Sequence, residues 1–225
     1  LELHRSPSTL NLYLRAVTAK KSGQTPSESR HLMTVSLKGV QANMKSLTAY
    51  RKVCGFPLSG SLPVTYPFVL AFPLHMEMLV SDAFPFPLLG LVHVKNEITQ
   101  YRAIGNQEVL DIECSLVGPR PANKGLEFDI HTRVHVAGKL VWECVSAMLR
   151  RMPESGDKKK DSTDKKAEEA APQNVVSWPI SESTGRRYAA ASGDRNPIHL
   201  YALTAKMFGF PRAIAHGMWT KAHCL

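Results

Sequence analysis

Residues 61–80 read SLPVTYPFVLAFPLHMEMLV and lie in the most hydrophobic region of the chain. Pro67 suits the first turn of a helix, where its missing N–H costs nothing. Four large apolar side chains follow at helical spacing, namely Phe68, Phe72, Met76 and Leu79. The stretch therefore predicts a buried helix, and Pro73 inside it predicts a kink.

Downstream of this helix the apolar period changes from helical to two, which is typical of strands. Three segments show it: LLGLVHVKNEI (88–98), VLDIECSLVG (109–118) and LEFDIHTRVHVAGKLVWECVSAMLRR (126–151). In the last, residues 137–139 predict a hairpin turn. On the first strand of this hairpin, apolar residues alternate with polar ones and so share one face: Phe128, Ile130, Val134 and Val136. On the returning strand the apolar residues at odd-numbered positions share one face: Val141, Val145, Ala147 and Leu149. One apolar helix followed by antiparallel strands predicts an α+β fold in which a sheet wraps the helix.

Composition and charge exclude several classes of protein. The chain has 225 residues, of which 44% are hydrophobic, and a net charge of 28 − 19 = +9. Prolines interrupt the hydrophobic region, so we expect no membrane span. The positive charge favours anionic partners, but no basic stripe interleaved with aromatics indicates nucleic acid. Four scattered cysteines and no signal peptide indicate a reduced, cytoplasmic protein. Because the chain begins without methionine, we expect a fragment or a processed chain.

Residues 153–172, PESGDKKKDSTDKKAEEAAP, divide the chain. They hold five lysines and six acidic residues between two prolines and almost no apolar side chains. Such a segment buries too little apolar surface to offset its ordering entropy, so it predicts a flexible charged linker. The first domain is then 1–152 and the second 173–225, where 199–210 and 213–225 are predicted helices.

The second domain contains SGDRNPIHLYALTAKMFGF, residues 192–210. A structural interpretation makes Ser192 or Asp194 a helix N-cap, with Pro197 inside the first turn. A cap does not require His199, however. A carboxylate and an imidazole that converge on one water can activate it for addition to a polarised double bond.

A second stretch, FPRAIAHGMWTKA (210–222), places Gly217 near the start of an apolar helix. An exposed amide there can donate to an oxygen that gains negative charge, as in an oxyanion hole. The structural alternatives are a close packing contact at Gly217 and a satisfied buried histidine at His216.

Two segments, YAAASGDRNPIHL (188–200) and AKMFGFPRAIAHGMW (205–219), closely resemble the signature of the (R)-specific enoyl-CoA hydratases, the hydratase 2 or MaoC-like family. The first half, through TYPFVLAFPLHMEML (65–79) and FPFPLLGLVHVKNEI (84–98), resembles the amino-terminal repeat of the family's double hot-dog members. Only the linker and the extreme start lie outside the resemblance. It implies a tandem hot-dog fold in which 1–152 is a non-catalytic repeat and 173–225 begins an incomplete catalytic one.

The resemblance also implies an activity and its residues. Asp194 and His199 would hold the catalytic water, the Gly217 amide would bind the thioester carbonyl, and Asn196 would arrange the loop. The reaction would be reversible hydration of trans-2-enoyl thioesters to (R)-3-hydroxyacyl thioesters, without metal or redox cofactor. The alternatives are a dehydratase acting on acyl carrier protein, whose chemistry is the same, and a non-catalytic acyl-thioester binding module. We expect the 225-residue chain alone to be inactive, and leave monomer and homodimer open.

Other candidates are weaker. His131 and His135 share a strand face but lack a third zinc ligand. His223 and Cys224 are a poor thiol–imidazole pair, and His75 has no suitably spaced acid. Arg186 and Arg187 fit coenzyme phosphates and a solvated helix equally well. For the acyl chain, the candidate tunnel residues, equally compatible with ordinary core, are Tyr66, Phe68, Phe72 and Met76.

Overall fold

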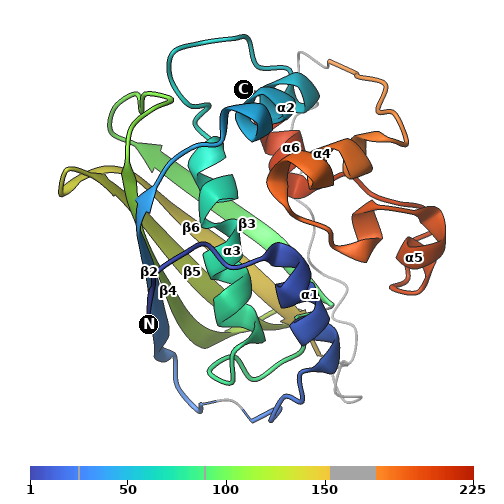
Figure 1. Ribbon diagram of the computed structural model, residues 1–225. Coiled ribbons are helices and arrows are strands. Elements are labelled where there is room, and N and C mark those ends of the chain that lie inside the picture. The colour runs from blue at the N-terminus through green and yellow to red at the C-terminus, as the bar shows by residue number, and fades with distance from the viewer. Residues whose placement is uncertain (25, 89, 153–175) are drawn as a thin grey trace, which may run out of the picture.

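The computed structural model describes residues 1–24, 26–88, 90–152 and 176–225 (Figure 1). The predicted linker 153–172 lies outside the described residues. The helices are α1 (Thr9–Thr18), α2 (Met44–Cys54), α3 (Tyr66–Val80), α4 (Thr184–Ser192), the 3₁₀ helix η1 (Pro197–His199), α5 (Ala202–Lys206) and α6 (Gly217–His223). The strands are β1 (Glu2–Leu3), β2 (Arg30–Val40), β3 (Leu91–Gln100), β4 (Leu110–Ala122), β5 (Gly125–Val136) and β6 (Lys139–Arg151).

The strands form one sheet in the order β1-β2-β4-β5-β6-β3. The short β1 pairs with β2 in parallel, and all other neighbours are antiparallel. The sheet curves around α3, which lies along its concave face (Figure 1). The α+β prediction of a sheet wrapped around a helix is therefore confirmed.

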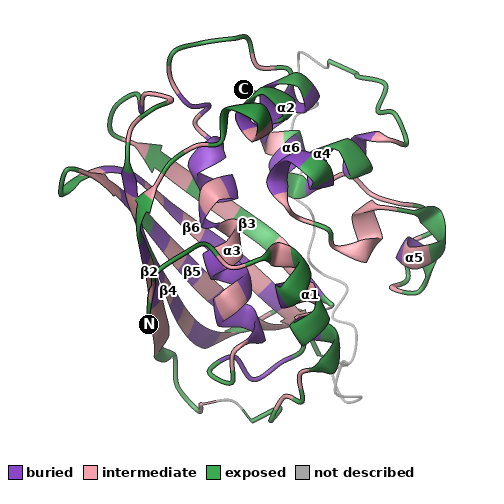
Figure 2. Ribbon diagram, in the orientation of Figure 1, coloured by how far each residue is buried: buried purple, intermediate pink, exposed green. Residues whose placement is uncertain are grey.

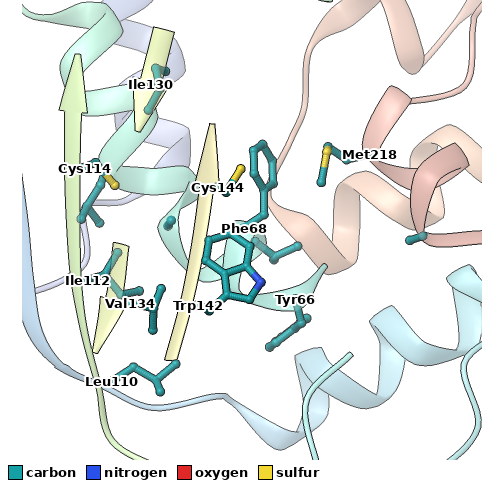
Figure 3. Packing of buried hydrophobic residues seen from close by; sticks show 14 of the residues in the cluster. Tyr66, Phe68, Leu110, Ile112, Cys114, Ile130, Val134, Trp142, Cys144 and Met218 are labelled. Atoms are coloured by element: carbon teal, nitrogen blue, oxygen red, sulfur yellow. The ribbon is translucent and has the colours of Figure 1, made fainter. Parts of the chain in front are cut away.

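Helix α3 is buried on most of its surface (Figure 2). Pro67 occupies its first turn, as predicted, and the helix continues through Pro73 to Val80. Trp142 of β6 packs among the core side chains beside Tyr66 and Phe68 (Figure 3), and its Nε1 donates to the Val64 carbonyl at 2.8 Å. A largely apolar helix thus has the sheet on one side and further helices on the other.

The β5–β6 hairpin turns at Ala137 and Gly138, both with positive φ. Cross-strand neighbours share a sheet face, and the partners of Val134, Ile130 and Phe128 are Trp142, Ser146 and Met148. The even-numbered residues of β6 therefore face α3, and the predicted parity, with Val145 and Ala147, is wrong. A register shift between Val134 and His135 causes the change.

Residues 176–225 fold as short helices against α2 and one end of α3 (Figure 1). Trp219 of α6 donates from Nε1 to the Val53 carbonyl at 2.8 Å, and Lys221 donates to Asn96 of β3. The hydrophobic core shared with the first half includes Tyr188, Ala191, Met218, Trp219 and Ala222. The predicted helices 199–210 and 213–225 are shorter than expected, being α5 and α6, and α4 was not anticipated.

Among the described residues, no helix is long and apolar enough to cross a membrane. The four cysteines are free thiols, with Cys54, Cys114 and Cys144 buried and Cys224 exposed.

Candidate active site

The turn after α4 presents Asp194. Gly193 ends the helix in the left-handed conformation, with φ of 79°, so SGD closes one helix and does not open another. The N-cap of η1 is Asn196, whose Oδ1 accepts from Ile198 N at 3.4 Å, and Pro197 follows in the first turn. The predicted cap at Ser192 or Asp194 is therefore wrong. Asp194 Oδ1 instead accepts from Asn196 N at 3.1 Å, and the side chain lines a cavity.

His199 lines the same cavity, at the end of η1. Its Nδ1 lies 2.9 Å from the Ile214 carbonyl oxygen, which only accepts, so Nδ1 carries the proton and Nε2 keeps its lone pair. Burial lowers the pKa of His199, which favours the neutral imidazole. The arrangement leaves a neutral base close to the Asp194 carboxylate.

The close approach of α4 to η1 depends on Gly185. A Cβ at this position would lie 2.0 Å from the His199 carbonyl oxygen and 3.1 Å from the carbonyl carbon. No larger residue fits without moving the turn. The absence of a side chain at Gly185 thus allows the backbone of His199 to pack against α4.

His216 packs directly behind the pair. Its ring stacks on that of His199 with a centroid distance of 3.8 Å, and its Nε2 donates to the Asp194 carbonyl at 3.1 Å. Burial lowers its pKa to about 4. Nδ1 is buried and finds no hydrogen-bond partner among the described residues, so His216 is buried but only partly satisfied.

Gly217 is the first residue of α6 and lines the cavity. A Cβ there would meet no atom within 4 Å, so close packing does not explain the glycine. Within the described part of the chain, its amide donates to no acceptor, as expected at the start of a helix. An amide that is free at a cavity wall can donate to a bound oxygen.

The cavity has a volume of about 420 Å³ and extends from these residues along α3. Phe68, Phe72 and Met76 line it, as the tunnel hypothesis expects, whereas Tyr66 lies in the core with 1% exposure. His93 of β3 also borders it. The cavity therefore has a mainly apolar wall from the first half and a polar mouth from the second, a combination typical of ligand sites.

Tyr13 of α1 is a site residue that sequence reasoning missed. Its hydroxyl donates to Asp194 Oδ1 at 3.0 Å and accepts from Arg195 N at 2.9 Å. Burial, together with the neighbouring Asp194, raises the pKa of Tyr13, so the hydroxyl stays protonated. No local pattern points to it, because Tyr13 lies in α1, far along the chain from the Asp194 motif.

Comparison with known proteins shows the family of the chain. The model of the "MaoC like domain" family matches residues 163–224. A curated relative, 3-hydroxyacyl-thioester dehydratase X of Mycobacterium tuberculosis, is 34% identical over 220 residues, which is 97% of this chain and 78% of the relative. The chain belongs to the MaoC-like dehydratase family. As a family member it is a hydro-lyase.

Solved structures of MaoC-like dehydratases extend the likeness to the fold. The crystal structure of HtdX from Mycobacterium tuberculosis superposes with a TM-score of 0.72 and 34% identity, covering 86% of this chain and 75% of that one. A MaoC-like dehydratase from Phytophthora capsici has a TM-score of 0.59 and 17% identity, covering 87% and 72%. The sheet and its central helix are therefore a hot-dog-like fold.

In this MaoC-like chain, Asp194, His199 and His216 are the described residues that come nearest to a metal site, with ligand atoms within 4.8 Å of one another. Two imidazoles coordinate one ion only when both ring planes contain it. The rings of His199 and His216 are stacked, with centroids 3.8 Å apart and an angle of 29° between their planes. One ion therefore cannot lie in both ring planes at bonding distance from a nitrogen of each ring. One nitrogen of each ring, His199 Nδ1 and His216 Nε2, also donates to a backbone carbonyl. The cluster fits acid–base chemistry better than metal binding.

The remaining candidates of the MaoC-like chain have structural contacts. His75 is buried, with Nε2 2.8 Å from Thr132 Oγ1, and burial lowers its pKa to about 3. His223 stacks on Trp219 and donates from Nδ1 to the Cys54 carbonyl.

The strand pair His131 and His135 lies outside the His and Asp group described above. Arg186 donates to the Leu200 carbonyl and lies over the Tyr201 ring, so its role toward coenzyme phosphates stays a prediction, as does that of Arg187.

Proposed function

We propose that this chain catalyses the reversible interconversion of (R)-3-hydroxyacyl thioesters and trans-2-enoyl thioesters. The observation that carries the proposal is the meeting of the Asp194 carboxylate and the neutral His199 imidazole at the mouth of one mainly apolar cavity. A non-catalytic acyl-binding module has no need for this pair. The name of the Mycobacterium tuberculosis relative supports the same substrate class.

In the hydration direction, a water held between Asp194 and His199 Nε2 attacks C3 of the enoyl group. Its oxygen bonds to C3 while the π electrons of the C2–C3 bond shift toward C2 and the thioester oxygen. The pair takes the proton that the water releases and delivers a proton to C2, so that H and OH add across the double bond. Dehydration is the reverse, and the chemistry asks for no oxidant, reductant or metal.

The developing charge on the thioester oxygen needs a donor. We assign this role to the Gly217 amide, which is free at the cavity wall and has open space where a side chain would stand. A preorganised backbone donor of this kind commonly contributes about 10²–10³-fold to the rate. Asn196 holds the turn through its bond to Ile198 N, which keeps Asp194 and His199 on the same side.

The acyl chain would lie along Phe68, Phe72 and Met76 of α3, which places the substrate tail in the first half of the chain. This supports the tandem arrangement, in which 1–152 is a non-catalytic repeat that shapes the acyl cavity and 173–225 begins the catalytic repeat. The family match confined to 163–224 supports the same division. We take coenzyme A as the carrier, and its phosphates suit the net charge of +9.

The test is turnover of a medium-chain trans-2-enoyl-CoA, followed by loss of enoyl absorbance and by chiral analysis of the product. Because we expect the 225 residues alone to be inactive, wild type here and in the assays below is a longer chain that contains them. Wild type should form the (R)-3-hydroxy product, and Asp194→Asn should lose at least about 10³-fold in kcat while it keeps the melting temperature. Turnover only with the acyl-carrier-protein thioester would reject coenzyme A as the carrier. A folded wild type that binds both thioesters without turning them over would reject the enzyme and favour the non-catalytic binding module.

A further inference from the structure

One oxygen of Asp194 is held by two donors from different parts of the chain. Oδ1 accepts from the Tyr13 hydroxyl at 3.0 Å and from Asn196 N at 3.1 Å. The same hydroxyl accepts from Arg195 N at 2.9 Å, so one side chain fixes both the carboxylate and the backbone beside it. Oδ2 lies 4.0 Å from His216 Nε2 and remains the oxygen that can accept from a water.

Tyr13 is held in place by the anchoring of its helix. Leu12 and Ala16 of α1 form a buried cluster with Met76 and Val80 of α3. Arg15 makes a bidentate ion pair with Glu77, with N–O distances of 2.7 and 2.9 Å. The hydroxyl is therefore carried by a helix fixed to the central helix, as preorganisation of a reacting group requires.

The chemistry of the tyrosine suits this task. A hydroxyl donates and accepts at once, whereas a phenylalanine in the same space does neither. The raised pKa of Tyr13 keeps its proton in place as a donor over the working range of pH. A donor to a carboxylate stabilises the ionised form and fixes the direction of the lone pairs that face the water.

We propose that Tyr13 is a positioning residue, which orients the Asp194 carboxylate toward the catalytic water. The inference rests on the proposed dehydratase function and adds to it a residue outside the MaoC-like segment. Tyr13 acts through Asp194 and takes no part in bond making.

Removing the hydroxyl as Tyr13→Phe should lower kcat about ten- to a hundredfold, the usual effect of one hydrogen bond to a charged group. KM should stay within about twofold, since the acyl wall is unchanged. The acidic limb of the kcat profile should move to higher pH, because the ionised carboxylate loses a donor. The other titratable groups around Asp194 are His199, His216, His93, Tyr188 and Arg195, and the substitution replaces none of them.

The experiment compares wild type, Tyr13→Phe, Asp194→Asn and the double variant in the enoyl-CoA assay. If Tyr13 acts through Asp194, the double variant is no slower than Asp194→Asn alone. Tyr101→Phe is the matched control, because Tyr101 also donates to a carboxylate, that of Glu143, but lies outside the cavity. It should keep wild-type kcat and pH profile.

A second variant protects the test against misfolding. Incorporation of 3-fluorotyrosine at position 13 keeps the shape and strengthens the donor, so the acidic limb should move to lower pH, opposite to the shift in Tyr13→Phe. Unchanged kcat and pH profile in folded Tyr13→Phe, or an unshifted profile with 3-fluorotyrosine, would overturn the inference. Failure of wild type to turn over any thioester would instead overturn the proposed function.

Discussion

Replacing Gly185 with alanine tests whether the approach of α4 positions the catalytic imidazole. The added Cβ would stand 2.0 Å from the His199 carbonyl oxygen, where contacts below 3.0 Å are essentially never seen. The turn must retreat by about 1 Å, and a displacement of this size at a catalytic group commonly costs about 10²-fold. The φ of Gly185 lies outside the left-handed region, so alanine adds no backbone strain and the effect is one of packing.

We therefore expect Gly185→Ala to lower kcat about a hundredfold, with a smaller change in KM. Overpacking should also cost about 1–3 kcal/mol of unfolding free energy, which for a chain of this length lowers the melting temperature by several degrees. Enoyl-CoA hydration and thermal unfolding measure the two effects separately. Gly60→Ala is the control, because a Cβ at Gly60 meets nothing within 4 Å. A folded Gly185→Ala protein with wild-type kcat would refute this account of His199.

Two further predictions concern stability. Trp219→Phe leaves the buried Val53 carbonyl without its donor and should cost about 1–3 kcal/mol in urea unfolding, whereas Trp178→Phe, at a half-exposed position, should cost less. His75 has a folded pKa of about 3 against about 6.5 when unfolded, so its neutral form stabilises the fold above pH 6.5, and this stability is lost as the pH falls. At pH 5 the loss is roughly 2 kcal/mol. The variant His75→Gln can still form a hydrogen bond with Thr132 but does not titrate. Its unfolding free energy should therefore fall less than that of wild type between pH 7 and pH 5. An equal fall in both proteins would contradict the assignment.

The hairpin shows where alternation along a strand stops being informative. Val136 pairs with Lys139 and His135 with Leu140, a register that would place Val141 opposite Val134 and Val145 opposite Ile130. That is the parity predicted from the sequence. The shift after His135 inserts one residue, so every later side chain of β6 changes face. A bulge depends on the packing of both strands, and neither strand alone reveals it.

The candidate catalytic motif was more predictable than the elements that hold it. Asp194, Asn196 and His199 lie within one turn, so local sequence already places them together, although the turn follows a helix C-terminus and not an N-cap. Tyr13 stands 181 residues before Asp194 and carries no motif. Its role follows from the docking of α1 on α3, which is a tertiary contact.

The site needs both halves of the chain for a physical reason. Residues 176–225 supply the carboxylate, the imidazole and the free amide, but their helices are short, and α5 has only five residues. Isolated helices of this length are marginal in water, so their geometry must come from packing. That packing comes from α2, which receives Trp219, and from α1, whose Tyr13 fixes Asp194. In the proposed mechanism the first half, although it lacks the motif, therefore serves the rate by orienting Asp194 as well as by forming the acyl wall.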